Sequence, residues 1–316
     1  MLKKYKISDL IKPITGSVEV LGSKMVIVSS PASINTATHD SFTFCSKKNA
    51  QAVELVRNSP AKVIVCSSEL SFSSIDYGDK TLILVENPRL AFIEILQCYF
   101  TERRESGISP SAVIDVSAEI HPKVYIGPHC YIGVCKIEEG TIIHGNVHID
   151  SNVTIGRNVT INSGVTIGVE DAFAYERNSQ GELVKFPHFG GVVIEDDVDI
   201  HVHANIDRGT FGNTVIGKGT KINRYAHIGH NGVIGRHCQI GGKVFIAGSC
   251  HIGDYCEIAF CSCLRNGTKI GKNVLIGMGS VVTGDVEDDW VVYGAPARKI
   301  RKNKILPWRQ KSLVEN

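Results

Sequence analysis

The sequence predicts a mainly β protein, in which a small α/β domain precedes a long parallel β-helix and a short charged tail follows it. Two observations carry this prediction. Aliphatic residues recur at every sixth position through residues 215–282, twelve times in succession. Residues 1–107 lack that spacing and show the runs typical of alternating strands and helices.

The six-residue spacing matches neither an α-helix, with its period of 3.6 residues, nor a strand, with its period of 2. It is typical of hexapeptide repeats, in which each repeat forms a short strand and a turn. Three repeats complete one triangular coil, so each aliphatic residue points inward and stacks on its counterpart three repeats later, in the next coil. These positions are Ile216, Ile222, Ile228, Ile234, Ile240, Ile246, Ile252, Ile258, Leu264, Ile270, Ile276 and Val282.

The repeats begin earlier, at Ile114, and a long break separates Ile167 from Ile194. An insertion of that length must leave a regular β-helix as a loop, and such loops often carry function. We therefore predict a β-helix domain over residues 108–283, about eight coils in all, with a loop insertion at residues 168–193.

Strand-like and helix-like segments take turns in the first domain, residues 1–107, which is typical of an α/β fold. The segments are residues 17–28, 42–44, 49–58, 62–67 and 81–100. Residues 101–109 are polar, contain a glycine and are interpreted as a linker. Residues 284–316 form the tail, and we expect its final part, residues 300–316, to be helical or partly disordered.

Composition narrows the classes of function. The chain has 316 residues, a net charge of +2 and no basic stripe in the repeats, which argues against nucleic acid as a partner. We find neither a signal peptide nor an apolar run long enough to span a bilayer, so we expect a soluble, cytoplasmic protein without an integral membrane segment. Cys256, Cys261 and Cys263 lack the spacing of a zinc site, and we expect them to be small apolar fillers.

One pair of residues suggests chemistry. Gly248 follows His230 at an interval of three repeats, one full coil, so the two should stack on the same edge of the prism. A neutral imidazole beside an exposed backbone N–H supplies a general base and an oxyanion donor, the two groups that acyl transfer from a thioester to an amine requires. An alternative is a zinc site like that of γ-class carbonic anhydrases, which needs three converging imidazoles. The spacing of that class is absent around His227 and His230, so we expect no metal.

Several segments then point to a family. IDRG, NTVIG, IGHNGVIG and IAGS, in this order within residues 206–249, resemble the core of the UDP-3-O-acylglucosamine N-acyltransferases of lipid A synthesis. Upstream, EDAFAY, FPHFGGVVI, FTF and ENPRLAF resemble segments of the same family, so the resemblance covers about residues 5–283. It implies a left-handed β-helix with His230 as catalytic base and Gly248 as the oxyanion donor.

The resemblance also implies the remaining site residues. Expected to contact the substrate are Phe44, Lys47, Asp171, Phe173, Tyr175, His188, Asp207 and Arg208, and expected to contact the acyl donor are Ala247 and Asn266. Three positions depart from the family. Residues 47–50 lack the tyrosine that packs on uracil, Asn223 replaces an aspartate expected to orient the catalytic histidine, and Gly267 replaces a second histidine.

The tail resembles a different group. YGAPARKIRK is similar to the ending of hexapeptide acyltransferases that use coenzyme A, in which a Gly-Pro turn and basic residues lie along pantetheine and phosphates. The donor-binding residues implied here are Gly294, Pro296, Ala297, Arg298, Lys299 and Arg301.

The leading hypothesis is therefore an N-acyltransferase that moves a short, 3-hydroxylated or plain acyl group from acyl-CoA to the amine of a dTDP- or UDP-linked amino sugar for a surface glycan. One alternative is the lipid A enzyme itself, which takes a long 3-hydroxyacyl chain from acyl carrier protein. Another is a non-catalytic β-helix that binds a nucleotide sugar or serves as a scaffold. In each case we expect no permanently bound cofactor and, because the prism faces need cover, a homotrimer.

Overall fold

The computed structural model describes residues 4–101, 104–170 and 173–304, and the chain divides into two compact units, Met1–Arg103 and Arg104–Asn316. The first strand of the second unit, β8, begins at Gly107, the last residue of the predicted first domain and part of the predicted linker. Strand β8 pairs in parallel with β11, so the β-helix begins one strand before Ile114, the first residue of the predicted repeats.

The first unit is a three-layer α/β fold around a five-stranded sheet of order β2-β7-β6-β5-β4. Its strands are β1 (Tyr5–Lys6), β2 (Glu19–Leu21), β3 (Ile27–Val28), β4 (Ser30–Pro31), β5 (Ser41–Phe44), β6 (Val63–Ser67) and β7 (Thr81–Val85). Its helices are α1 (Ile7–Leu10), α2 (Ala50–Asn58), α3 (Ser74–Tyr77) and α4 (Pro88–Tyr99). Strands β4 to β7 are parallel, and β2 joins β7 antiparallel.

The apolar runs of β6 and β7 are buried on both faces, as parallel strands between two helical layers must be. Val63 and Val65 pack with α1 and α4 on one face, whereas Ile64 and Cys66 pack with α2 on the other. This alternation confirms the predicted small α/β domain.

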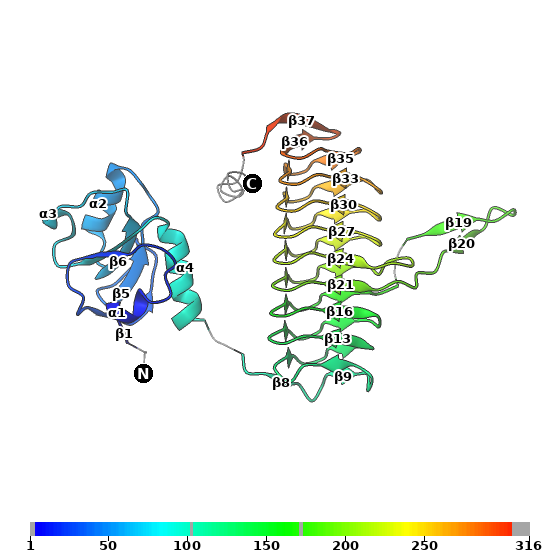
Figure 1. Ribbon diagram of the computed structural model, residues 1–316, viewed down its shortest axis with the longest axis horizontal. Helices are drawn as coiled ribbons and strands as arrows, with labels where there is room; N and C mark the ends of the chain where they lie inside the picture. The colour runs from blue at the N-terminus through cyan, green and yellow to red at the C-terminus, as the bar shows by residue number, and fades with distance from the viewer. Residues whose placement is uncertain (1–3, 102–103, 171–172, 305–316) are drawn as a thin grey trace, which may run out of the picture. The chain divides into compact units, whose positions relative to one another are not determined.

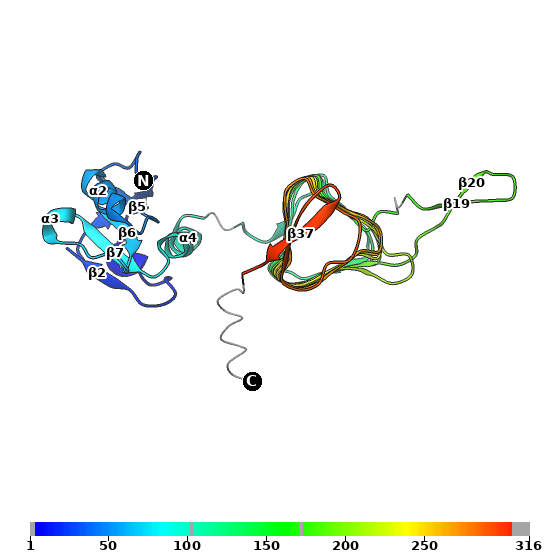
Figure 2. The ribbon, with the colours of Figure 1, turned by 90° about the horizontal axis from the view of Figure 1, so that it is seen from above.

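The second unit is a triangular β-helix with three parallel sheets, and Figure 2 shows the triangle in projection. Sheet I contains β10 (Glu119–Ile120), β13 (Cys135–Ile137), β16 (Val153–Ile155), β21 (Val192–Ile194), β24 (Thr214–Ile216), β27 (Val233–Ile234), β30 (His251–Ile252) and β33 (Lys269–Ile270). Sheet II contains β8 (Gly107–Ile108), β11 (Tyr125–Ile126), β14 (Ile142–Ile143), β17 (Thr160–Ile161), β22 (Asp199–Ile200), β25 (Lys221–Ile222), β28 (Gln239–Ile240), β31 (Glu257–Ile258), β34 (Leu275–Ile276), β36 (Trp290–Gly294) and β37 (Ala297–Lys302). Sheet III contains β9 (Val113–Ile114), β12 (Tyr131–Ile132), β15 (His148–Ile149), β18 (Thr166–Ile167), β23 (Asn205–Ile206), β26 (His227–Ile228), β29 (Phe245–Ile246), β32 (Cys263–Leu264) and β35 (Val281–Val282).

The aliphatic residues at six-residue spacing form the core of the prism. Ile228 pairs in register with Ile246 and both are fully buried, so each coil stacks on the next as predicted. The inner corners carry small residues, and several of these donate to a carbonyl of the next coil. Thr220 Oγ1 bonds Gly235 O at 2.8 Å and Cys238 Sγ bonds Gly253 O at 3.2 Å.

Cys256 fills such an inner corner, as expected, and its thiol donates to Gly271 O at 3.0 Å. The same expectation is wrong for Cys261 and Cys263, which are exposed. Cys263 is the outward residue of β32, and Cys261 lies in the turn before it, so neither side chain enters the interior of the prism. In the described part of the chain no helix is long and apolar enough to span a bilayer.

The insertion leaves the prism as predicted, and Figure 1 shows its arm, the hairpin of β19 (Tyr175–Arg177) and β20 (Leu183–Lys185). It ends at residue 191 and not at 193, because Val192 already pairs with Val153 in sheet I.

The tail differs from its prediction. Strands β36 and β37 form an antiparallel hairpin that extends sheet II, with a cis peptide between Ala295 and Pro296. Trp290 and Ala297 pack on the core of the prism. The expectation of a helix or disorder is therefore wrong for residues 300–302, and residues 305–316 lie outside the described residues.

Candidate active site

The turns that lead from sheet III to sheet I form one edge of the prism, which we call the III–I corner. His230 lies in the turn from β26 to β27, and Gly248 lies in the next turn of that corner, from β29 to β30. Ser249 N–H donates to His230 O at 2.7 Å and joins the two turns. The interval of one coil thus makes His230 and Gly248 neighbours, as expected.

The contact between the two residues requires glycine. A Cβ on Gly248 would stand 2.5 Å from Nε2 and 2.8 Å from Nδ1 of His230, because the imidazole lies directly against the glycine Cα. The Gly248 N–H makes no hydrogen bond within the described residues. The geometry therefore presents an imidazole and a free backbone donor side by side.

The surroundings of His230 favour a neutral ring. Burial, and secondly the neighbouring His188, lower the pKa of His230 below the ordinary value for histidine. A neutral imidazole at neutral pH can accept a proton, which is the property a general base needs.

His188 is the closest aromatic neighbour of His230 that the structure records. The ring centroids lie 4.9 Å apart with an interplanar angle of 81°. The side chain of His188 is 3% exposed, and its Nδ1 lies 2.9 Å from Phe186 O. The family resemblance assigned His188 to the substrate, and the structure places it at the catalytic histidine.

Both interruptions of the repeats emerge at the III–I corner. Residues 168–191 link β18 to β21, and residues 207–213 link β23 to β24. The two loops are bonded to each other, with Phe189 N–H donating to Thr210 O at 2.8 Å. Thr210 N–H in turn donates to Asn231 Oδ1 at 2.7 Å, and Asn231 Nδ2 returns a bond to Thr210 Oγ1. The sequence did not indicate that Asn231, the last residue of the IGHN motif, bonds the loop of residues 207–213.

Asp207 and Arg208, expected to contact substrate, have partners within the chain. Asp207 is buried, with its Oδ2 3.6 Å from Nε2 of His227. The guanidinium of Arg208 donates to Gly168 O at 2.7 Å and to Ser151 O at 3.2 Å. Both side chains therefore make contacts within the chain where the two loops leave the prism. That either one contacts the substrate stays a prediction.

Two aromatic residues expected at the sugar lie on the arm. Phe173 and Tyr175 are exposed and meet each other at 5.2 Å in an edge contact. Asp171, predicted with them, lies outside the described residues.

Asn223 does not lie at the site within one chain. It stands in the turn from sheet II to sheet III, and its Oδ1 accepts the N–H of Arg224 at 2.7 Å. The stretch between Asn223 and His230 covers one whole side of the triangle, so contact between them would need a neighbouring chain, and the role of Asn223 stays a prediction.

The residues expected to bind the donor extend along the III–I corner. Ala247 lies in the same turn as Gly248, one coil beyond His230, and Asn266 is one coil beyond Gly248. One further coil leads to Gly284, which lines a hollow of about 490 Å³ together with Arg298 and Lys299. Three inter-strand spacings of about 4.8 Å put this hollow roughly 14 Å from His230.

The rest of the GAPARKI segment forms the hairpin itself. Gly294 and Ala297 pair across the turn that contains Pro296, and the Arg301 guanidinium donates to Lys302 O at 3.1 Å. Lys299 pairs with Glu287 and lies over the Trp290 ring. This segment is therefore ordered by its own contacts.

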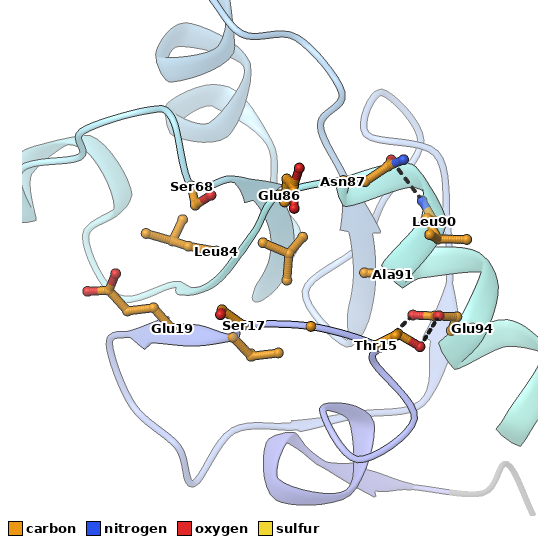
Figure 3. Close-up of a pocket in the computed structure, with 13 residues that line it drawn as sticks. Thr15, Ser17, Glu19, Ser68, Leu84, Glu86, Asn87, Leu90, Ala91 and Glu94 are labelled. Atoms are coloured by element: carbon orange, nitrogen blue, oxygen red, sulfur yellow. Dashed lines mark hydrogen bonds between the residues drawn. The ribbon is translucent and has the colours of Figure 1, made fainter. Parts of the chain in front are cut away.

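Phe44 and Lys47 belong to the first unit, at the carboxyl end of β5. The Phe44 ring packs on Phe92 at 4.9 Å, and Lys47 Nζ bonds Gln51 Oε1 at 2.7 Å. A hollow of about 540 Å³ opens beside β7, between β2 and α4 (Figure 3). Its lining includes Glu19, Glu86 and Glu94 but no lysine or arginine, so it does not suit the phosphates of a nucleotide.

Comparison with known proteins agrees with this geometry. The family model described as bacterial transferase hexapeptide (six repeats) matches residues 134–168 and 231–266. The UDP-3-O-acylglucosamine N-acyltransferase 1 of Francisella tularensis subsp. holarctica (strain OSU18) is 33% identical over 252 residues, 73% of this chain and 72% of the relative. The enzyme of the same name from Legionella pneumophila (strain Paris) is 37% identical over 237 residues, 67% and 64% of the two chains. The solved Francisella novicida UDP-N-acetylglucosamine acyltransferase has a TM-score of 0.58 at 30% identity, covering 66% of this chain and 78% of that one.

The hexapeptide-repeat match and the relatives named as acyltransferases confirm the predicted left-handed β-helix and the enzyme class, an acyltransferase. The chain belongs to the family of UDP-3-O-acylglucosamine N-acyltransferases. The relatives' names favour the lipid A enzyme, given above as an alternative, over the coenzyme A-dependent enzyme given as the leading hypothesis, and they disfavour the non-catalytic scaffold.

Proposed function

We propose that the protein transfers an acyl group from a carrier thioester to the free amine of a UDP-linked 3-O-acylglucosamine, the N-acylation step of lipid A synthesis. The observation that carries this proposal is the contact of the His230 imidazole with Gly248 at the corner from which both loops emerge. The family provides the acceptor, because the relatives are named for it.

The proposed chemistry needs two protein groups. As the amine nitrogen attacks the thioester carbonyl carbon, His230 takes the amine proton and the C–N bond forms. The negative charge on the carbonyl oxygen is stabilised by the N–H of Gly248, a donor aimed where charge develops. The C–S bond then breaks, and the leaving thiolate recovers the proton from the His230 imidazolium, which returns the base to its neutral form.

The donor would lie along the III–I corner. Its thioester must be at His230, and Arg298 and Lys299 line a hollow together with Gly284, whose turn lies in the same corner three coils from His230. Basic side chains suit the phosphate of a phosphopantetheine arm. Acyl carrier protein and coenzyme A share that arm, and the family favours the carrier protein.

A second candidate retains the coenzyme A donor and a different nucleotide-linked amino sugar. It rests on the first unit, where residues 47–50 hold no aromatic side chain for a uracil and Lys47 is bonded to Gln51. It also rests on the β36–β37 hairpin, whose sequence resembles coenzyme A-dependent enzymes.

We further propose that the chain forms a homotrimer. The outward positions of neighbouring strands in sheet I, beside the III–I corner, are Val193, Val215 and Val233. An apolar ladder on an outer face gains by burial against a second prism. Light scattering on the purified protein tests this state, and a monomer would contradict it.

The function is tested with the full-length protein, UDP-3-O-acylglucosamine and a 3-hydroxyacyl carrier protein, with the amide product measured by mass spectrometry. Parallel reactions with 3-hydroxyacyl-CoA and with dTDP-linked amino sugars distinguish the second candidate. Removal of the base in His230→Ala should lower kcat by about 10²–10⁴-fold. Equal turnover by wild type and His230→Ala would show that His230 is not the base.

A further inference from the structure

His188 is held at the point where the insertion returns to the prism. Its ring contacts Phe186 and His230, and Glu170, whose carboxylate pairs with Lys185, has its pKa lowered in part by the His188 backbone. The segment is held by backbone bonds to the second loop, because Phe189 N–H donates to Thr210 O at 2.8 Å and Gly190 N–H donates to Gly209 O at 2.9 Å. The imidazole of His188 is therefore fixed by the loops on either side.

The hydrogen bond to Phe186 determines which nitrogen of His188 carries hydrogen. A carbonyl oxygen only accepts, so Nδ1, 2.9 Å from Phe186 O, is the donor. In the neutral ring Nε2 then holds a lone pair and can only accept.

That acceptor is buried and has no hydrogen-bond partner among the described residues. Buried polar atoms are nearly always paired, so an unpaired one inside a site marks a bond that forms in another state. The ring beside it is His230, 4.9 Å away between centroids. A protonated imidazole donates from both nitrogens, and formation of the His230 imidazolium would supply the missing donor.

We infer that His188 is a positioning residue for His230: its Nε2 accepts one N–H of the His230 ring, so that the other nitrogen faces the substrate amine and the imidazolium is held after proton transfer. The inference rests on the proposed function, in which His230 is the base. In Ser-His-Asp triads a carboxylate does this work by fixing the tautomer of the histidine and stabilising its charged form. Here a second imidazole of the same chain does so.

Two nearby histidines also suggest a metal site. Among the described residues no third histidine, cysteine, aspartate or glutamate joins them in a group that could hold an ion. Full activity after treatment with a chelator is expected. Loss of activity that added zinc restores would overturn the inference, because the pair would then be metal ligands.

Two variants of similar size separate the acceptor from the packing. His188→Gln retains an amide near the position of Nε2, and its oxygen can accept; His188→Leu fills the space without an acceptor. We expect kcat of His188→Leu to fall about 10–100-fold with little change in KM for the sugar, and kcat of His188→Gln to stay within about threefold of wild type.

A double variant completes the experiment. If His188 acts through His230, then adding His188→Leu to His230→Ala should not lower the residual rate further. Thermal melting checks that each variant is folded. Equal kcat in His188→Leu and His188→Gln, whether both high or both low, would overturn the inference for His188, whereas an active His230→Ala would overturn the proposed function instead.

Discussion

The two units bury their apolar residues in different ways, and the difference decides how each one can form a site. In the first unit, five strands lie between helical layers, and each strand end meets residues distant in the sequence. In the β-helix, every coil contributes one turn to each corner. Residues one coil apart therefore form a column, and His230, Gly248, Asn266 and Gly284 follow one another along the III–I corner.

In the β-helix, a fixed interval in the sequence places two residues next to each other in the site. In the layered sheet of the first unit, no fixed interval does so. The interval between His230 and Gly248 predicted a contact that the coordinates contain. No interval in the first unit predicts the hollow beside β7, since it joins residues 15–19 to residues 84–94. Four predictions test this contrast.

The largest effect is expected for Gly248→Ala. The added Cβ would stand 2.5 Å from Nε2 of His230, so the imidazole must move off its position, and kcat should fall at least about 10³-fold, comparable to loss of an oxyanion donor or base. Gly235→Ala is the matched control at the corner between sheets I and II, where the Cβ would stand 2.6 Å from Asp254 N. Both variants should melt at lower temperature, and only Gly248→Ala should lose activity. Similar loss in both would mean that the effect is one of coil packing.

The second-largest effect is expected for substitutions in the proposed donor-binding hollow at Gly284. Replacing Arg298 and Lys299 together by alanine should raise KM for the acyl donor about tenfold with kcat unchanged, because two charged contacts of about 0.7 kcal/mol each are lost. Lys302→Ala, in the same hairpin but outside the Gly284 hollow, serves as control. Steady-state kinetics at several salt concentrations measure the effect. An unchanged KM would place the donor elsewhere.

A smaller effect concerns pH. Burial and His188 lower the pKa of His230, and the base works only when neutral, so activity should fall on the acid side at a pH below the ordinary histidine value. With a pKa of 6.5, only about a quarter of the base would be neutral at pH 6.0. We expect kcat/KM at pH 6.0 to be more than a quarter of its plateau value, because the pKa of His230 is lowered. An acidic limb at or above pH 6.5 would contradict the environment described for His230.

The smallest effect on catalysis is expected in the first unit. Asn87 caps α4, and its side chain accepts Leu90 N–H at 3.1 Å (Figure 3). Asn87→Ala should lower the unfolding free energy of that unit by about 1 kcal/mol, measured by urea denaturation, and leave kcat unaltered. A large fall in kcat would show that the α4 terminus belongs to the active site.

Much of this architecture was predictable because the repeat is so regular. The six-residue positions are the core, and the break after Ile167 is the insertion. The sequence did not reveal that the tail continues the prism, since β36 pairs with β34 without the usual spacing. Nor did it show that Asn223 and His230 occupy different corners of the prism.

The sequence by itself determined the β-helix, its breaks and the pairing of His230 with Gly248, because stacking of coils converts an interval of three repeats into adjacency. Only the tertiary structure decided that the two loops are bonded to each other at one corner, and that His188 meets His230. Loop paths depend on contacts such as those between Thr210 and Asn231, which no periodicity encodes. The positions of site residues in the repeats therefore follow from intervals in the sequence, whereas the positions of site residues in the loops follow from contacts in the folded structure.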